Sequence, residues 1–303
     1  MRTFVADPVS DVTVTHGEGP RWDAARDELV YVDIEAGGVH RAKLREGYLE
    51  EIAAFTADRP VGAANPVAGQ PGAWLLAAGT GFARADEQPD GSVAIRYAPG
   101  PDAGREREVR MNEAVCDPVG RLAAGTMAWD ETPGAGRVLV LDLDGSVREL
   151  IPSATIANGT AWSADGTTMY WSDSGAGTVT AFAYDVARAS VGGARVIVER
   201  RRDEGVADGI AIDDEGCLWL ALYGGRAVHR VSPHGEHLAS VDIPVDHVTA
   251  VAFAGTTLLV TTSRRGLDPS TLAGQPNAGR VFAVDVSVSG PPAAPFRGTL
   301  PSA

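Results

Sequence analysis

The chain has 303 residues, enough for one large domain or two small ones. Its formal net charge of -14 repels the phosphate backbone of nucleic acids, so we expect no nucleic-acid partner. Its two cysteines, Cys116 and Cys217, lie in apolar segments and indicate a reducing compartment. The first residues lack the apolar core of a signal peptide, and no apolar segment reaches membrane-spanning length. We therefore expect a cytoplasmic protein with no membrane contact.

One pattern recurs six times along the chain: an apolar segment, a tight turn, and a second apolar segment that begins near Leu or Met. The copies occupy residues 19–33, 65–79, 113–127, 158–174, 208–222 and 248–263. Their turns centre on Asp27, Gly72, Gly120, Gly166, Gly216 and Gly255, at intervals of 45, 48, 46, 50 and 39 residues. Repeats of about 45 residues are typical of four-stranded propeller blades. We therefore predict an all-β fold, a six-bladed β-propeller with four antiparallel strands per blade.

Alternating apolar and polar residues divide each copy into strands. In the fourth copy we expect strands at 159–163, 167–174, 178–185 and 194–200. The last copy has only three strands before a proline-rich tail, so an N-terminal strand from 3–8 or 11–15 should close the ring and cover its open edge. Residues 265–279 form a long loop. We see no domain boundary, and predict a single domain over 1–303.

Each copy carries a polar residue ten or eleven positions before the Leu or Met that begins its second strand. These residues are Glu18, Asn65, Asn112, Asn158, Asp208 and His247. An Asn or Asp before Gly is also an ordinary turn residue. Six polar residues at one register of a ring, however, would meet at one end of the central channel, and we expect them to surround that opening.

Carboxylates gathered at such an opening repel one another unless a cation lies between them. Glu18, Asn158 and Asp208 offer oxygen ligands only, two of them anionic, which suits Ca²⁺, Mg²⁺ or Mn²⁺; Zn²⁺ and Fe²⁺ stay open. Three protein ligands leave coordination positions for water and substrate, as in catalytic metal sites. The sequence predicts one divalent ion at these three residues.

With these residues placed, the chain resembles the SMP-30/gluconolactonase/LRE family over almost its whole length. The resemblance rests on the segments EGPRWD, VYVDIEAGGVHR, VGAANP, RMNEAVCDPVGRLAAGTM, NGTAWSADGTTMYWSDS and DGIAIDDEGCLWLALYGG. It implies a six-bladed propeller whose axial divalent ion is held by Glu18, Asn158 and Asp208, and it implies hydrolysis of sugar lactones.

The resemblance also implies substrate contacts. Arg110 and Asn112 match the residues that bind substrate hydroxyls in lactone-hydrolysing relatives, and Asp130 lies close to where relatives carry another acid that faces substrate. Asp208 would double as the general base. His247, which holds the axial register of the sixth copy, is a further candidate for substrate contact.

One segment departs from the family pattern. The usual Asn-Asp-Gly after the arginine is Asn112-Glu113-Ala114 in this chain. The loss of the glycine removes backbone freedom beside the pocket, and alternation along the strand would point Glu113 away from the axis. The segment therefore puts the details of substrate contact in question.

The expected partner is a small-molecule substrate, and the sequence is compatible with a monomer. The function we predict is divalent-metal-dependent hydrolysis of a sugar lactone to the aldonic acid, with Asp208 removing a proton from water. The chain has no nucleophile elbow or triad spacing. Three alternatives stay open: hydrolysis of phosphotriesters or aryl esters, a recruited role in secondary metabolism with a non-sugar substrate, and non-catalytic calcium binding.

Overall fold

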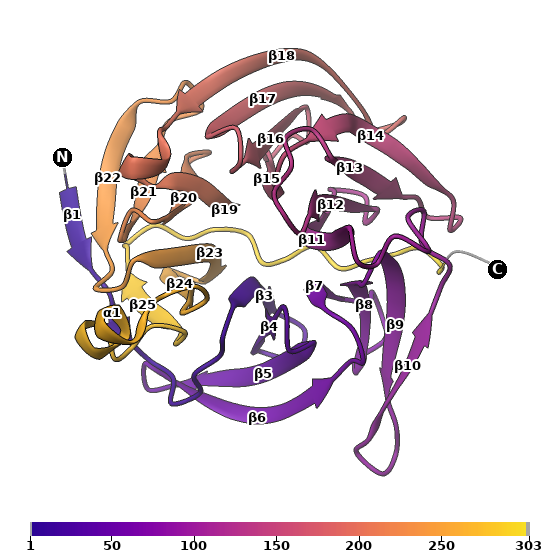
Figure 1. Cartoon of the computed structure of the whole chain (residues 1–303), viewed down its shortest axis with the longest axis horizontal. Helices are drawn as coiled ribbons and strands as arrows, with labels where there is room; N and C mark the ends of the chain where they lie inside the picture. The colour runs from indigo at the N-terminus through magenta and orange to yellow at the C-terminus, as the bar shows by residue number, and fades with distance from the viewer. Residues whose placement is uncertain (1, 301–303) are drawn as a thin grey trace.

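The structure, a computed structural model, describes residues 2–300. Its sheets stand around a central axis as the blades of an all-β propeller (Figure 1). The innermost strands, labelled near the middle of that view, are β3, β7, β11, β15, β19 and β23. Four of the sheets are separate and have four strands each, all antiparallel.

The four separate sheets follow the chain in order, each running from its innermost to its outermost strand. The first holds β3 (Gly17–Asp23), β4 (Glu28–Asp33), β5 (Gly38–Arg45) and β6 (Tyr48–Thr56), and the second β7 (Val61–Pro66), β8 (Ala73–Ala78), β9 (Gly81–Glu87) and β10 (Val93–Tyr97). The third holds β11 (Val109–Cys116), β12 (Leu122–Ala128), β13 (Gly136–Leu141) and β14 (Val147–Ala154), and the fourth β15 (Ala157–Trp162), β16 (Thr168–Asp173), β17 (Thr178–Asp185) and β18 (Ser190–Glu199).

The remaining strands form one nine-stranded sheet. It holds β19 (Val206–Ile212), β20 (Leu218–Tyr223), β21 (Ala227–Val231), β22 (His237–Asp242), β23 (His247–Ala254), β24 (Thr257–Ser263), β25 (Phe282–Asp285), β1 (Arg2–Val5) and β2 (Asp7–Pro8). One residue pair, Tyr223 with His247, joins β20 to β23. The prediction of separate four-stranded blades is therefore confirmed for the first four blades. The strands expected for the last two blades belong instead to one connected sheet.

The structure contains the predicted turns, and an N-terminal strand closes the ring. All six predicted turn residues have a positive φ, between 54° and 93°, and Asp27 is the one non-glycine among them. Of the two N-terminal segments considered, 3–8 supplies the closing strand, because Asp7 and Pro8 pair with β25, while β1 adds to the outer strand β22 in parallel. Segment 11–15 forms no strand.

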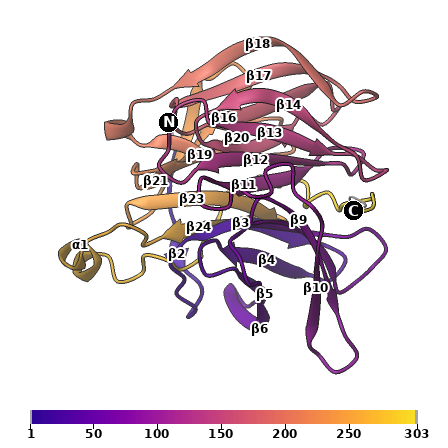
Figure 2. The same ribbon diagram turned by 45° about the vertical axis from the view of Figure 1, so that its right-hand side comes forward.

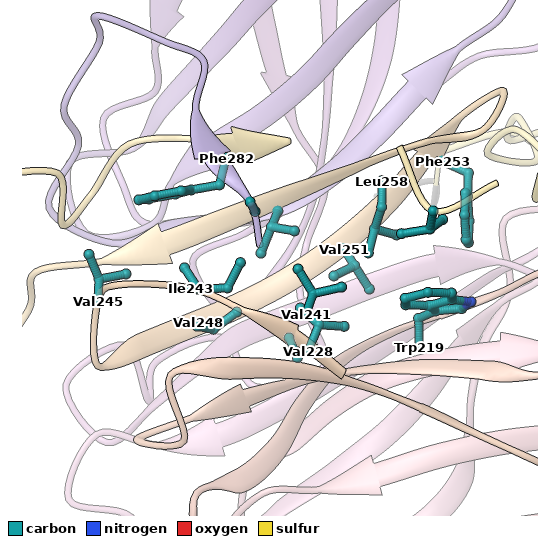
Figure 3. Close-up of a cluster of buried hydrophobic side chains, with 14 of the residues drawn as sticks. Trp219, Val228, Val241, Ile243, Val245, Val248, Val251, Phe253, Leu258 and Phe282 are labelled. Carbon is teal, nitrogen blue, oxygen red and sulfur yellow. The ribbon is translucent and has the colours of Figure 1, made fainter. Parts of the chain in front are cut away.

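Apolar side chains fill the spaces between neighbouring groups of strands. The largest such cluster lies inside the nine-stranded sheet, where Trp219 and Val241 from the β19–β22 half pack against Val251, Leu258 and Phe282 from the β23–β25 half (Figure 3). This sheet therefore folds onto itself around a core of its own, as two separate sheets of a propeller would.

Within residues 2–300, helical structure is confined to two short segments. The loop predicted over 265–279 contains α1 (Pro269–Gly274), which projects beyond the sheets (Figures 1 and 2), and Asp268 caps it by accepting hydrogen bonds from the amides of Ser270 and Thr271. A 3-10 turn, η1, spans Arg202–Glu204. From Arg2 to Leu300, no helix has both the length and the apolar character that crossing a bilayer requires.

The C-terminal segment 289–299, which we call the C-terminal strap, crosses the ring from the nine-stranded sheet to the far side (Figure 1). The amide of Phe296 donates to the Pro66 carbonyl at 2.8 Å, and that of Arg297 donates to the Gly120 carbonyl at 2.9 Å. The Phe296 side chain is 2% exposed and packs into the core between the second and third sheets. The strap therefore links blades that are distant in sequence.

Replacing Phe296 with alanine should destabilise the protein by about 3–5 kcal/mol, the usual cost of truncating a buried phenylalanine. Chemical denaturation measures the free energy of unfolding. Phe4→Ala is the control, because Phe4 is only half-buried on the edge strand β1, and it should cost clearly less. Equal losses in the two variants would show that the strap is not a stabilising link.

Candidate metal centre and substrate cavity

Each inner strand has an irregular register near its start. The shifts fall at Glu18–Arg21 in β3, Val61–Ala63 in β7, Met111–Ala114 in β11, Ala157–Thr160 in β15, Ala207–Ile210 in β19 and Val248–Ala250 in β23. Bulges of this kind release a residue from regular pairing and redirect its side chain, and they recur beside active sites. Four predicted site residues lie at these shifts: Glu18, Asn112, Asn158 and Asp208.

Close packing of the inner strands explains the glycine that follows two of these residues. A Cβ on Gly159, after Asn158, would lie 2.3 Å from the carbonyl oxygen of Asp208. A Cβ on Gly209 would lie 2.4 Å from the Cβ of Ala250. Any other residue would push the next strand outward, so these glycines let the inner strands approach the axis and one another.

A cavity of about 280 Å³ opens where these strands begin. Six of the predicted site residues line it: Glu18, Arg110, Asn112, Asn158, Asp208 and His247. Sequence reasoning did not select most of its other polar residues, which include His16, Glu131, Ser174, Arg202, Tyr223 and Arg265. The structure thus brings together residues from distant sheets, which supply both acids and cations.

The three predicted metal ligands are all deeply buried. Glu18, Asn158 and Asp208 are 3%, 6% and 4% exposed. The Asn158 Nδ2 donates to Asp208 Oδ1 and, at 3.2 Å, to Ser174 Oγ, whereas its Oδ1 is buried without a hydrogen-bond partner. An unpartnered amide oxygen beside two buried carboxylates is a donor set that fits a hard divalent cation.

The pKa values of the two carboxyl groups also indicate a cation site. Burial, followed by the charge of Glu113, raises the pKa of Glu18 to about 8. Burial, followed by the charges of Glu18 and Glu113, raises the pKa of Asp208 well above its usual value. Both carboxylates therefore resist ionisation unless positive charge lies nearby, and a divalent cation would supply it.

The candidate metal centre needs the side-chain amide of Asn158 as a ligand. Within residues 2–300, no three His, Cys, Asp or Glu side chains lie close enough to hold a metal ion by themselves. The candidate centre has two carboxylates, so Asn158 is required as the third protein ligand. Oxygen-only coordination of this kind favours Ca²⁺, Mg²⁺ or Mn²⁺ over softer ions.

Arg110 and Asn112 lie side by side in the cavity wall. The Arg110 Nη1 donates to Asn112 Oδ1 at 2.7 Å and to the Met111 carbonyl at 3.0 Å, and its guanidinium lies 5.2 Å from the centre of the Trp129 ring. The Asn112 Nδ2 donates to the Ala157 carbonyl at 3.0 Å. These contacts fix both side chains, as residues that orient a substrate require.

The structure does not bring Asp130 to this cavity. Asp130 is exposed in the turn after β12, where its carboxylate accepts hydrogen bonds from the amide and hydroxyl of Thr132 at 3.0 and 2.7 Å. The next residue, Glu131, has a φ of 57° and lines the cavity instead. The left-handed conformation at Glu131 is a feature of the turn that residue spacing does not reveal.

The expectation of six residues at one opening is wrong for Asn65. In β7 the register shifts between Val61 and Ala63, so Asn65 lies beyond the bulge, paired with Leu75. Its side chain does not line the cavity: its amide donates to the Ala114 carbonyl at 3.1 Å, and its oxygen accepts from Arg21 at 3.3 Å. Counting back from the second strand therefore misplaced this residue.

Two aromatic rings form part of the wall. Tyr223 and His247 stack with their ring centres 4.1 Å apart and their planes 12° from parallel, at the point where β20 and β23 pair. His16 also lines the cavity, and burial, followed by the charges of Arg110 and Arg265, lowers its pKa to about 3. Burial raises the pKa of Tyr223 to about 12, so His16 and Tyr223 are both uncharged at neutral pH.

Glu113, the residue that departs from the family pattern, forms a buried ion pair with Arg21. Glu113 accepts from Arg21 Nη2 at 3.0 Å, and both side chains are almost fully buried. Arg21 also donates to the Ala114 carbonyl at 2.9 Å and to Asn65. Glu113 does not line the cavity, in agreement with the expectation that it points away, yet its charge still reaches Glu18 and Asp208.

The chain is similar to known proteins in both sequence and structure. Residues 16–264 match the family model described as SMP-30/Gluconolactonase/LRE-like region. Regucalcin from Sus scrofa is 34% identical over 292 residues, which cover 93% of this chain and 95% of that protein.

Two solved structures share the fold over nearly the full length. One is described as a calcium-binding protein, regucalcin, from Agrobacterium tumefaciens; it is 26% identical, with a TM-score of 0.88, and the match covers 99% of this chain and 100% of that one. A luciferin-regenerating enzyme is 29% identical, with a TM-score of 0.85 and coverage of 94% and 96%.

Asp208→Asn should weaken divalent-ion binding at least tenfold, because one of two anionic ligands is lost. In the presence of a chelator the same variant should melt higher than the unmodified protein, by about 1.5 °C for each kcal/mol of repulsion removed. Calorimetric titration with Ca²⁺ or Mn²⁺ and thermal melts with chelator measure the two effects. Unchanged ion affinity would remove Asp208 from the centre.

Arg21→Met should cost about 3–5 kcal/mol of stability, because it leaves Glu113 buried without its partner. Arg21→Met combined with Glu113→Leu should be less destabilised than Arg21→Met alone, since no unpaired charge remains. Denaturant unfolding of both variants decides this. A double variant as unstable as the single one would mean that the loss comes from packing and not from the charge.

Proposed function

The chain belongs to the SMP-30/gluconolactonase/LRE-like family, and we propose that it hydrolyses a sugar lactone to the open-chain hydroxy acid with one divalent ion as cofactor. The observation that carries the proposal is the group of Glu18, Asp208 and the unpartnered amide oxygen of Asn158 at one buried cavity. Arg110 and Asn112 line the same cavity and can position a polyhydroxyl substrate.

Glu18, Asn158 and Asp208 would hold the ion. When bound, a divalent ion supplies Lewis-acid chemistry: it polarises the lactone carbonyl and stabilises the negative charge that develops on its oxygen. The three residues leave room for further ligands, since their cavity has a volume of about 280 Å³, which suits a molecule of monosaccharide size. The two carboxylates would balance the charge of the ion.

Asp208 is the proposed general base. Its carboxylate lines the cavity beside Glu18 and Asn158, where a water molecule and the substrate would meet. As the water oxygen forms a bond to the carbonyl carbon, Asp208 takes a proton from that water. The ring C–O bond then breaks, the ring oxygen takes up a proton, and the open-chain hydroxy acid is released.

Arg110 and Asn112 orient the substrate in this proposal. Both side chains are held by hydrogen bonds to the backbone, Arg110 to Met111 and Asn112 to Ala157. Rigid donors of this kind restrict a hydroxylated ring to few orientations, and a misplacement of about 1 Å can cost roughly a hundredfold in rate. The stacked rings of Tyr223 and His247 add an aromatic surface to the same cavity.

A second candidate function is calcium binding without catalysis. It is favoured by the description of the Agrobacterium tumefaciens relative as a calcium-binding protein, and the same three ligands would serve it. It does not require the polar wall formed by Arg110 and Asn112, which lies beside the ligands. Turnover of a lactone would decide in favour of the enzyme.

We also propose that the nine-stranded sheet serves as the fifth and sixth blades of a single six-bladed domain. Its two halves enclose a core of their own and share only the pair formed by Tyr223 and His247. Each half then supplies one inner strand, β19 or β23, to the cavity. On this interpretation Asp208 and His247 are contributions of successive blades.

Asp208→Ala should abolish lactone hydrolysis, because both a metal ligand and the base are lost, whereas Arg110→Ala should mainly raise KM. The measurement is acid release from a panel of neutral aldonolactones, with Ca²⁺, Mg²⁺ or Mn²⁺ added to chelator-treated protein. Asp90→Asn is the control, since Asp90 is exposed in the hairpin between β9 and β10 and should leave the rate unchanged. Undiminished turnover by Asp208→Ala would refute the assignment.

A further inference from the structure

The cavity contains an arginine with no acidic partner. Arg110 is 2% exposed, and within residues 2–300 it forms no ion pair; its Nε is buried without any hydrogen-bond partner. Its guanidinium donates only to the Met111 carbonyl and the Asn112 side chain. Buried arginines are normally paired with an anion, so a free one in a cavity points to an anionic ligand.

A second arginine faces the same space. Arg265 follows β24 and lines the cavity together with Arg110, and it is held close to the start of β3 by the bridge between Ser263 and His16. After burial, the charge of Arg265 is the largest cause that lowers the pKa of Arg110, to about 10. Two like charges therefore lie near each other in one cavity.

Arg265 is paired with a partly exposed acid that lies outside the cavity. Arg265 forms an ion pair with Glu35, which does not line the cavity, and each side chain is 34% exposed. Ion pairs in contact with water contribute little and are readily broken. An anionic group bound inside the cavity could therefore replace Glu35 as the partner of Arg265 and, at the same time, supply the partner that Arg110 lacks.

We propose that Arg110 and Arg265 form an anion-binding subsite that selects lactones carrying an additional carboxylate or phosphate group. The inference rests on the proposed lactonase function and narrows its substrate class. Guanidinium groups bind either kind of anion through paired hydrogen bonds. The cavity of about 280 Å³ limits the substrate to one small, acidic sugar lactone.

The first experiment compares three lactones of similar ring size: a neutral aldonolactone, an aldarolactone with a free carboxylate, and a phosphorylated aldonolactone. The unmodified protein should have a kcat/KM at least tenfold higher for one of the two anionic substrates than for the neutral one. Which anionic substrate is preferred identifies the group. Equal or lower kcat/KM for both anionic substrates would overturn the proposal.

Three variants test the subsite itself. Arg265→Gln should lower the ratio of anionic to neutral kcat/KM at least tenfold, and Arg265→Lys should restore part of it. Glu35→Gln should raise the ratio several-fold, because it frees Arg265. Arg264→Gln, at an exposed neighbouring position outside the cavity, should leave the ratio unchanged. A ratio that Arg265→Gln does not alter, in a variant with an unchanged melting temperature, contradicts the subsite.

A binding measurement separates failure of the subsite from failure of the lactonase proposal. If the unmodified protein hydrolyses none of the lactones, the proposed function fails, yet the subsite can still be tested. Protein supplied with Mg²⁺, so that Glu18 and Asp208 are compensated, should bind glucarate by calorimetry and should not bind neutral glucitol. Arg265→Gln should weaken glucarate binding at least tenfold. Absence of glucarate binding to the unmodified, Mg²⁺-supplied protein would overturn the subsite.

Discussion

The repulsion between two buried carboxylates is the central constraint on this molecule. Glu18 and Asp208 come from different sheets, and the fold brings both to one cavity where water does not screen them. Burial and the charge of Glu113 raise the pKa of Glu18, and burial and the charges of Glu18 and Glu113 raise the pKa of Asp208. A globular protein gains no stability from such an arrangement, and this is why we propose that the site binds a cation.

Ring closure holds these groups together against their repulsion. The inner strands are tightly packed, to the point that Gly159 and Gly209 cannot carry a side chain, and apolar cores fill the spaces between the sheets. The N-terminal strands and the C-terminal strap tie distant sheets together. The site therefore lies on rigid strands, which position reacting groups better than loops do.

Besides the ion pair of Arg202 with Glu131 in the cavity wall, three groups of charges around the axis bear on what the cavity binds. The two acids of the candidate metal centre, Glu18 and Asp208, line the cavity, and the ion pair of Arg21 with Glu113 lies outside it. At the wall, Arg110 lacks an acid partner, whereas Arg265 has one that is partly exposed. With a divalent ion in place, the acids would be neutralised and the arginines would leave the cavity positively charged. Such a cavity favours an acidic sugar lactone over a neutral one.

The sequence by itself determined the repeat, because each turn requires a locally defined backbone: Asp27 and the five predicted turn glycines all adopt a positive φ. It also indicated the three candidate ligands, because each is an oxygen-bearing residue at the same position of its own repeat. Only the tertiary structure decided which side chains reach the cavity. One extra residue in a strand reverses the face that later side chains occupy, so Asn65 contacts Arg21 while Asn158 contacts Asp208. Glu131 and Arg265 enter the cavity from loops, whose path depends on contacts between blades and not on residue spacing.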